Sequence, residues 1–237
     1  MKVAVVGKNS GYIKKQLKKY NLTLDSRRPW IVISYGGDGT ALLSERLYPE
    51  IPKLLLRHSS ICNKCSTHDF SKVLKALENR EFTIKKTSKL IATIKNRKLI
   101  ALNEINVHHS APYAIRLQVL INNELVEPLV IGDGLIVSTP FGSSGYYQTV
   151  VNKIFKKGLG LAYLNPMRNS KRFKIKARNK ILKEKDIVKV KVLRGPGILC
   201  SDNNESIIKI KKGDLIKIKK YSKGAKLVLL NKTRTKF

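Results

Sequence analysis

The sequence predicts an α/β domain with a parallel sheet over residues 1–82, followed by a β-rich, β-sandwich-like domain over residues 83–237. In the first region, apolar runs of strand length alternate with helical patterns, which is typical of a parallel sheet covered by helices. In the second region, short alternating runs are separated by turn residues, which favours paired strands. The last strand or tail can return to the first domain.

The elements expected in the first region are short. The expected strands are Val3–Val6, Trp30–Ile33 and Leu54–Leu56, and the expected helices are Tyr12–Tyr20 and Ser71–Asn79. Asp69 or Ser71 is expected to cap the second helix, because a short polar side chain can accept a hydrogen bond from an unpaired backbone N–H group there. Trp30 is expected to pack in the core.

The second region is expected to contain strands and one helix. The expected strands are Lys89–Lys95, Leu99–His108, Ala114–Ile121, Leu125–Ile131, Leu135–Ser138, Arg172–Ala177, Ile187–Leu193, Ser206–Ile210, Leu215–Lys219 and Lys226–Leu230. Asn122-Asn123 and Asn96-Arg97 mark hairpin reversals. Residues 145–155 are expected to form a helix whose amino terminus faces the ligand, with Ser143 and Ser144 as caps.

Composition indicates a globular protein of a reducing compartment. Hydrophobic residues make up 42% of the 237 residues, which is too many for a disordered chain. No apolar run approaches the length of about 18 residues that crosses a bilayer. The three cysteines form no even disulfide framework. These observations predict a cytoplasmic protein without membrane partners.

The net charge of +32 indicates partners that are polyanions, such as nucleotides, polyphosphate or nucleic acid. Lysine alternates with Ile or Phe in the last third of the chain, which is typical of strands with one basic face. That face can be a solvated surface or a nonspecific nucleic-acid surface. The motifs of sequence-specific nucleic-acid modules do not accompany it.

The stretch Tyr35-Gly36-Gly37-Asp38-Gly39-Thr40 directly follows an apolar run. A glycine-rich turn after a buried strand can hold phosphate against backbone N–H groups while it presents one carboxylate to a hydroxyl. Asp38 is therefore a candidate general base. The alternative is an ordinary Asp-Gly turn that ends a strand.

Two further blocks place polar groups where folding alone does not require them. Asn103 and Glu104 interrupt an apolar strand, and Gly132-Asp133-Gly134 begins a strand that continues to Pro140 and into Phe141–Tyr147. The three blocks, in this order, resemble the NAD kinase family, whose signature is GGDGT, an Asn-Glu pair and DGLIVSTPTGSTAY. The chain looks like a divergent, archaeal-like member of that family.

The resemblance implies transfer of phosphate from ATP or polyphosphate to the adenosine ribose 2′-hydroxyl of NAD, giving NADP, with Mg²⁺ or another divalent cation neutralising the phosphates. It also implies a ligand site in the cleft between the two domains, and a homo-oligomer, dimer or tetramer. The site residues that it implies are Asp38 as base, Gly36, Gly37, Gly39 and Thr40 at the phosphates, Asn103, Glu104 and Asp133 at the ribose and far nucleoside, and Ser144, Gly145, Tyr146 and Thr149 at the nucleobase pocket.

The chain departs from the family pattern at two places. Phe141, Ser144 and Gly145 stand where the signature has Thr, Thr and Ala. The stretch 54–68 replaces a glycine-rich GxLGFL segment, and it contains His58, Cys62, Cys65 and His68 in the pattern HxxxCxxCxxH. These four side chains can bind Zn²⁺, the two thiols can form a redox pair, or the cysteines can be free in an ordinary loop.

Two alternative functions remain open at this stage. A related kinase with a GGDGT turn can act on a lipid or nucleoside hydroxyl, and a basic nucleotide- or nucleic-acid-binding protein can keep the fold without catalysis. The sequence Asp202-Asn203-Asn204-Glu205 is expected to be a polar hairpin turn without an assigned function. His108 and His109 are adjacent in a strand, so they are expected to point to opposite faces.

Overall fold

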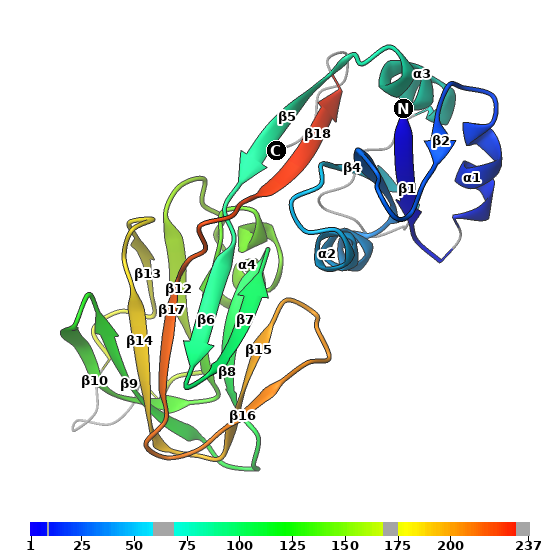
Figure 1. The fold of residues 1–237 in the computed structure, drawn as a ribbon. Coiled ribbons are helices and arrows are strands. Elements are labelled where there is room, and N and C mark those ends of the chain that lie inside the picture. The colour runs from blue at the N-terminus through cyan, green and yellow to red at the C-terminus, as the bar shows by residue number, and fades with distance from the viewer. Residues whose placement is uncertain (9, 59–68, 168–174, 231–237) are drawn as a thin grey trace. The chain divides into compact units, whose positions relative to one another are not determined.

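The computed structural model describes residues 1–8, 10–58, 69–167 and 175–230, which fall into two compact units (Figure 1). Unit 1 comprises Met1–Thr87 together with the segment that begins at Lys223, and unit 2 comprises Ser88–Ser222. Unit 1 is an α/β layer with a mostly parallel sheet and unit 2 is β-rich, which confirms the predicted fold class. Among the described helices, none is both long and apolar enough to cross a bilayer.

Unit 1 contains a six-stranded sheet in the order β2-β1-β3-β4-β18-β5. Neighbouring strands are parallel except β5, which pairs antiparallel with β18. The carboxyl-terminal strand β18 also pairs with β4, so the end of the described chain belongs to this sheet. The elements are β1 (Lys2–Val6), α1 (Gly11–Leu17), β2 (Thr23–Leu24), β3 (Ile31–Gly36), α2 (Asp38–Leu47), β4 (Lys53–Arg57), α3 (Phe70–Glu78), β5 (Phe82–Thr87) and β18 (Ala225–Leu230).

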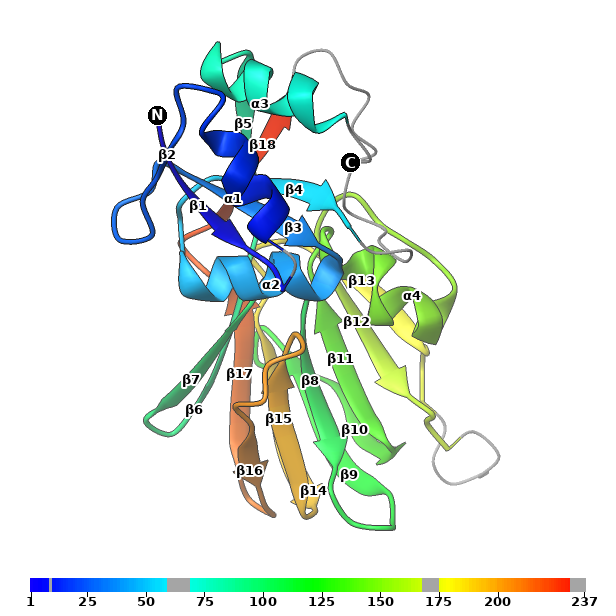
Figure 2. The same cartoon turned by 90° about the vertical axis from the view of Figure 1, so that its right-hand side faces the viewer.

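Helices cover both faces of the unit 1 sheet (Figure 2). The apolar residues of α1 and α3 pack with β1, β3 and β4 in one core cluster, whereas α2 contacts β3 and β4 from the other face. A strand covered on both faces needs a continuous apolar run, and in β3 all residues from Ile31 to Tyr35 are buried. Asp69 caps α3, as predicted, by accepting a hydrogen bond from the Ser71 N–H group at 3.0 Å.

Unit 2 consists of two six-stranded antiparallel sheets. The first has the order β10-β9-β14-β17-β6-β7 and the second has the order β13-β12-β11-β8-β15-β16. The strands of the first are β6 (Leu90–Ile94), β7 (Arg97–Ala101), β9 (Ile115–Ile121), β10 (Glu124–Gly132), β14 (Val188–Arg194) and β17 (Leu215–Lys220). The strands of the second are β8 (Glu104–His109), β11 (Gly134–Ser138), β12 (Leu159–Leu164), β13 (Asn179–Leu182), β15 (Gly197–Ser201) and β16 (Ile208–Ile210).

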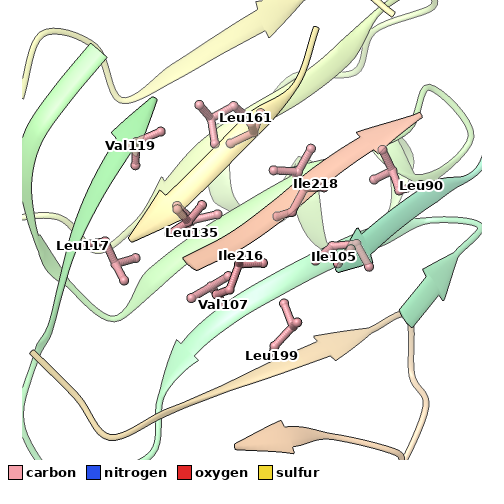
Figure 3. Close-up of a cluster of buried hydrophobic side chains, with 14 of the residues drawn as sticks. Leu90, Ile105, Val107, Leu117, Val119, Leu135, Leu161, Leu199, Ile216 and Ile218 are labelled. Carbon is pink, nitrogen blue, oxygen red and sulfur yellow. The ribbon is translucent and has the colours of Figure 1, made fainter. Parts of the chain in front are cut away.

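The core of unit 2 lies between these sheets. Leu117, Ile216 and other residues of the first sheet pack against Ile105, Leu135 and other residues of the second (Figure 3). The outer face of the second sheet is partly covered by the 3-10 turn Gly142–Ser144 and by α4 (Tyr146–Val151). That outer face is where the polar residues of the predicted dinucleotide site are found.

Four sequence predictions of local structure are wrong or only partly right. Leu99–His108 is not one strand, because the chain leaves the first sheet after β7, turns at residues 102–103 and enters the second sheet as β8. Trp30 is 58% exposed, since it precedes the buried part of β3. Residues 175–177 form no strand, and the rest of the predicted strand Arg172–Ala177 lies outside the described residues. The helix expected over 145–155 ends at Val151, because Asn152 adopts a left-handed conformation.

Candidate functional site

The glycine turn, Gly36–Thr40, joins β3 to α2 in unit 1. β3 ends at Gly36, Gly37 is the N-cap of α2, and Asp38 is the first residue of that helix. The Gly37 carbonyl accepts a hydrogen bond from the Thr40 N–H group at 3.0 Å. The first N–H groups of a helix lack partners within it, and the helix dipole favours an anion beside them. Asp38 is half-buried, so one turn offers both a carboxylate and amide groups that suit a phosphate.

Two glycines allow close backbone approach around this turn. A Cβ added to Gly36 would lie 2.2 Å from Oγ1 of Thr40, so no other residue fits there without displacing the start of α2. Gly7, directly after β1, has a φ of +148°, and a Cβ there would lie 2.1 Å from the carbonyl oxygen of Tyr35. Sequence reasoning did not select Gly7, although a glycine directly after a parallel strand was a signal that could have found it.

A buried ion pair fixes the other end of α2. Lys53 at the start of β4 contacts Glu45 of α2, and their side chains are 2% and 6% exposed. The Lys53 ammonium also donates a hydrogen bond to the carbonyl oxygen of Tyr48 at 2.6 Å. A buried charge is tolerated only when it is paired and hydrogen-bonded, and this pair meets both conditions. It ties the helix that begins with Asp38 to the neighbouring strand.

Of the proposed zinc ligands, only His58 lies in the described part of the chain. Its Nδ1 is 2.7 Å from the Tyr35 hydroxyl oxygen, and the two rings stack with centroids 4.5 Å apart. Cys62, Cys65 and His68 lie outside the described residues, so the zinc, redox and free-thiol alternatives stay predictions.

In unit 2, one carboxylate holds the chain where it crosses between the sheets. The Asp202 carboxylate accepts hydrogen bonds from the N–H groups of Leu102 at 2.9 Å, Asn103 at 2.7 Å and Glu104 at 3.2 Å. The Asp202 N–H group donates to the Glu104 carbonyl oxygen at 2.9 Å. The predicted polar turn after β15 therefore positions the Asn-Glu pair. Sequence reasoning found the turn but not this use of Asp202.

The segment after β11 is also hydrogen-bonded to the backbone of Asn103. The Thr139 N–H group and the Ser138 hydroxyl donate to the Asn103 carbonyl oxygen at 2.8 and 3.2 Å. The Thr139 hydroxyl donates to the Leu102 carbonyl oxygen at 2.7 Å and accepts from the Gly142 N–H group at 2.9 Å. A Cβ on Gly142 would lie 2.2 Å from the Asn103 carbonyl oxygen, so the 3-10 turn and the Asn-Glu corner pack backbone against backbone.

The outer side of the second sheet, here called the β8 face, carries the polar residues of β8. Glu104, Asn106 and His108 alternate with core residues, so they share this side of the sheet. Cys200 of β15 lies opposite Asn106 in the strand register. The Tyr146 ring, at the start of α4, stacks on His108 with centroids 6.2 Å apart. These residues come from three separated parts of the chain.

The pKa shifts of Tyr146, Cys200 and His108 reflect their burial and the charged groups near them. Burial raises the pKa of Tyr146, and electrostatic interactions with Asp133, Cys200 and Glu104 raise it further. Burial, followed by the charge of Glu104, raises the pKa of the Cys200 thiol. Burial lowers the pKa of His108, which favours the neutral imidazole. A phenol, a thiol and an imidazole that stay neutral near pH 7 suit the recognition of uncharged polar groups.

Asp133 lies where β10 passes into β11, and its backbone is held on both sides. Its N–H group donates to the Leu164 carbonyl oxygen, and its carbonyl oxygen accepts from the His109 N–H group, both at 3.0 Å. Its carboxylate oxygen is 3.9 Å from Nε2 of His109. His109 Nδ1 contacts the Ala111 carbonyl oxygen at 2.6 Å, whereas the His108 ring stacks on Tyr146, so the two adjacent histidines have different partners.

The other residues predicted for the nucleobase pocket lie on or next to α4. Gly145 is the N-cap of α4, and a Cβ there would lie 3.6 Å from Nδ2 of Asn103. Ser144 ends the 3-10 turn. The Thr149 hydroxyl donates to the Tyr146 carbonyl oxygen at 2.8 Å, within the helix. Contrary to the prediction, neither Ser143 nor Ser144 is the cap of α4, because Gly145 occupies the N-cap position and the Ser143 hydroxyl donates to the Pro140 carbonyl oxygen at 2.8 Å.

The predicted alternation of lysine with isoleucine is confirmed along β17, on the first sheet of unit 2. Buried Ile216 and Ile218 alternate there with Lys217 and Lys219, which are half-buried and exposed. Lys189 of β14 lies directly opposite Lys217. Like charges in opposite register weaken strand pairing, so an anion near them would be stabilising. Whether that anion is a nucleic acid stays a prediction.

Comparisons with known proteins identify the family. The profile of the ATP-NAD kinase C-terminal domain matches residues 102–230, which is more than half of the chain. An NAD kinase of Methanosphaera stadtmanae is 31% identical over 169 residues, covering 69% of this chain and 60% of that protein. An NAD kinase of Methanothermobacter thermautotrophicus is 26% identical over 185 residues, covering 76% of this chain and 64% of that protein.

The fold is shared with a solved structure as well. The crystal structure of an NAD kinase from Archaeoglobus fulgidus in complex with ATP superposes with a TM-score of 0.79 at 20% identity, covering 98% of this chain and 95% of that chain. The chain spans about three fifths of the length of the curated relatives that it matches. The profile match, together with the glycine turn and the Asn-Glu corner, confirms the resemblance noted in the sequence: the chain belongs to the ATP-NAD kinase family.

Proposed function

We propose that this protein is an NAD kinase, which transfers the terminal phosphate of ATP or polyphosphate to the adenosine ribose 2′-hydroxyl of NAD and so makes NADP. The observation that carries the proposal is Asp38 as the first residue of α2, directly after the Gly36-Gly37 end of a buried parallel strand. Family membership supports it, because the curated relatives are named NAD kinases.

In the proposed reaction, Asp38 accepts the proton of the 2′-hydroxyl while the hydroxyl oxygen forms a bond to the terminal phosphorus. The bond from that phosphorus to its bridging oxygen breaks, and ADP or shortened polyphosphate leaves. The amide groups of the glycine turn hold the donor phosphates. Asn103 and Glu104 hold the ribose, Asp133 the far nucleoside, and Tyr146 with its neighbours the base.

Mg²⁺ fits this donor set. No group of three or more His, Cys, Asp or Glu side chains that could hold a metal is found among the described residues. Mg²⁺ needs no such cage, because it is commonly bound by one or two carboxylates together with substrate phosphates and water. At the glycine turn, donor phosphates and water would supply oxygen ligands, and the ion would neutralise the phosphate charge during transfer, while Asp38 keeps its role as the base.

The test is NADP formation by the purified protein with NAD and Mg²⁺, comparing ATP with polyphosphate. Asp38→Asn removes the base but keeps the volume of the side chain, so turnover should fall by about 10²- to 10⁴-fold. Asp25→Asn is the matched control, because it removes a carboxylate from an exposed-loop hydrogen-bond network of the same unit and should leave turnover unchanged.

Each alternative has its own outcome in this assay. Phosphate transfer to a lipid or nucleoside, without NADP formation, would identify a different kinase with a GGDGT turn. Tight nucleotide binding without any transfer would favour a noncatalytic binder. Homo-oligomerisation, a cytoplasmic location and nonspecific nucleic-acid binding stay predictions that this assay does not address.

A further inference from the structure

Asn106 occupies the centre of the β8 face. Ile105 and Val107, its neighbours in the chain, belong to the sandwich core, so the Asn106 side chain points to the opposite side of the sheet. Glu104 and His108 lie two positions away on that same side. Asn106 is therefore flanked by a residue of the Asn-Glu pair and by the imidazole on which Tyr146 stacks.

The Asn106 amide is buried, and its oxygen has no hydrogen-bond partner in the described part of the chain. The residue is 5% exposed, and its Oδ1 accepts no hydrogen bond from any described residue. Most buried polar atoms have a partner, and an exception in a native fold requires an explanation. By contrast, both ends of the Asn122 amide are paired although this turn residue is exposed: its Nδ2 donates to Asp186 and its Oδ1 accepts from the Ile187 N–H group, both at 2.9 Å.

The surroundings of Asn106 point to a flat, polar ligand. Tyr146 is 41% exposed, and its ring lies parallel to within 17° of the His108 ring, so it offers an aromatic surface beside the amide. The charge of Glu104 contributes to raising the pKa values of both Tyr146 and Cys200, so these three side chains lie close together. Cys200 lies opposite Asn106 in register. A nucleobase combines the required flatness with hydrogen-bonding groups at its edge.

We propose that Asn106 is a recognition residue for the dinucleotide, hydrogen-bonded to a planar group that carries a donor next to an acceptor. NAD contains two such groups, the N6/N7 edge of adenine and the carboxamide of nicotinamide. An asparagine amide matches either one, because it presents one acceptor oxygen and donor hydrogens side by side. The inference rests on the proposed function and adds a residue to its base-binding side.

A ligand role and a structural role for Asn106 predict opposite effects on the free protein. If the amide serves the ligand, Asn106→Val removes an unsatisfied buried atom, and the free protein should keep or raise its Tm. If the amide serves the fold, the same change should lower the Tm. Asn106→Ala provides a smaller side chain in case Val is too bulky at its branched carbon.

The experiment measures NAD affinity by calorimetry and Tm without ligand for the wild type, Asn106→Val, Asn106→Ala and Asn122→Ala. The Asn106 variants should bind NAD at least about tenfold more weakly with an unchanged or higher Tm, because the ligand loses a buried hydrogen bond. Asn122→Ala should lower the Tm and leave NAD affinity unchanged. Unchanged NAD affinity in both Asn106 variants, or a clearly lowered Tm in both, would overturn the inference.

Two NAD analogues identify the partner group. Nicotinic acid adenine dinucleotide replaces the carboxamide with a carboxylate, and nicotinamide hypoxanthine dinucleotide replaces the adenine amino group with a carbonyl. The wild type and Asn106→Val should bind one of these analogues equally, namely the one that lacks the partner of Asn106. If Asn106→Val weakens the binding of NAD and of both analogues by the same factor, direct recognition by Asn106 is contradicted. Failure of the wild type to bind NAD at all would refute the proposed function, and the inference with it.

Discussion

The glycine turn of unit 1 is made by one short stretch of chain, whereas the β8 face of unit 2 is assembled from distant segments. Gly36 to Thr40 are consecutive, and their geometry follows from a strand that ends and a helix that begins. The β8 face combines β8, the start of α4 and β15. The three hydrogen bonds from Leu102, Asn103 and Glu104 to Asp202 span 98 to 100 positions of the sequence.

The two sites also differ in which chemical groups they use. In the proposed function, the glycine turn would bind phosphate mainly through backbone N–H groups, so it needs small residues together with one carboxylate. The β8 face would bind the dinucleotide through side chains, and hydrogen bonds elsewhere must hold each of these side chains in position. We therefore expect substitutions that destabilise the elements around the glycine turn to act mainly on folding. Substitutions around the Asn103 corner should act on ligand binding as well.

The largest expected effect on stability comes from the ion pair that anchors α2. Lys53→Met leaves the buried Glu45 carboxylate without its cation and should lower the free energy of unfolding by about 3–5 kcal/mol. Chemical denaturation of the purified variant measures this loss.

The double variant Lys53→Met with Glu45→Leu tests whether the loss of stability comes from removing the cation beside Glu45. It removes both charges and should recover most of the lost stability, because well-packed apolar residues replace a buried pair at little cost. A double variant as unstable as Lys53→Met alone would mean that the lysine contributes through packing or through its bond to Tyr48 instead.

Asp202→Ala is expected to have the next largest effect, and to act on both stability and ligand binding. It removes the acceptor of three N–H groups and should cost about 3 kcal/mol, since each unsatisfied buried donor costs about 1–3 kcal/mol. Because Asn103 and Glu104 are no longer positioned, the KM for NAD should rise more than kcat falls. Unfolding curves and steady-state kinetics measure the two effects.

Asp186→Ala is the matched control for that variant. Asp186 also accepts hydrogen bonds, from the Lys183 N–H group and from Asn122, but in the exposed loop that joins β13 to β14. It should lower stability modestly and leave the KM for NAD unchanged. Asp202→Asn keeps an acceptor oxygen and should rescue part of the KM effect. An unchanged KM in Asp202→Ala would remove Asp202 from its positioning role.

The contrast between the sites also explains what the sequence could predict. The glycine turn, the Asn-Glu pair and the Asp133 block are contiguous, so the pattern of residues identified them without a structure. Asp202 lies in a turn whose composition indicates only a hairpin, and its partners are about a hundred positions away. Asn106 looked like an ordinary strand residue, because burial without a hydrogen-bond partner has no sequence signal.

The errors in the fold have a similar cause. The apolar alternation continues through Leu102, so periodicity could not show that β7 and β8 belong to different sheets. β12 (Leu159–Leu164) was not predicted because it is buried on both faces, and a short, continuously apolar run does not distinguish a strand from a helix. The first region was easier to predict, since its parallel strands are separated by helices along the chain.

Gly142→Ala is expected to test the backbone contact beneath the Asn-Glu corner, with a cost of about 1–3 kcal/mol. The added methyl group would meet the backbone of Asn103 at 2.2 to 2.5 Å, so either the 3-10 turn or Asn103 must move. NAD affinity should fall together with stability. Calorimetric titration and thermal unfolding measure both quantities.

Gly11→Ala is the control for Gly142→Ala, because an added methyl group at this first residue of α1 meets no atom within 4 Å. It should leave both stability and NAD affinity nearly unchanged. Equal losses of affinity in both variants would mean that the loss in Gly142→Ala does not come from the contact with Asn103.

The smallest expected effect is an acid-dependent loss of stability in unit 1. Hydrogen bonds from the N–H groups of Arg28 and Arg27, together with Lys2, lower the pKa of Asp25 from 3.8 to about 2. A folded-state pKa below the unfolded value means that the unfolded chain binds the proton more readily. The stabilisation from Asp25 is therefore complete above pH 3.8 and disappears as the pH falls towards 2. Thermal unfolding between pH 5 and 2 should show a shallower fall in Tm for Asp25→Asn than for the wild type, whereas parallel curves would show that this carboxylate does not couple folding to pH.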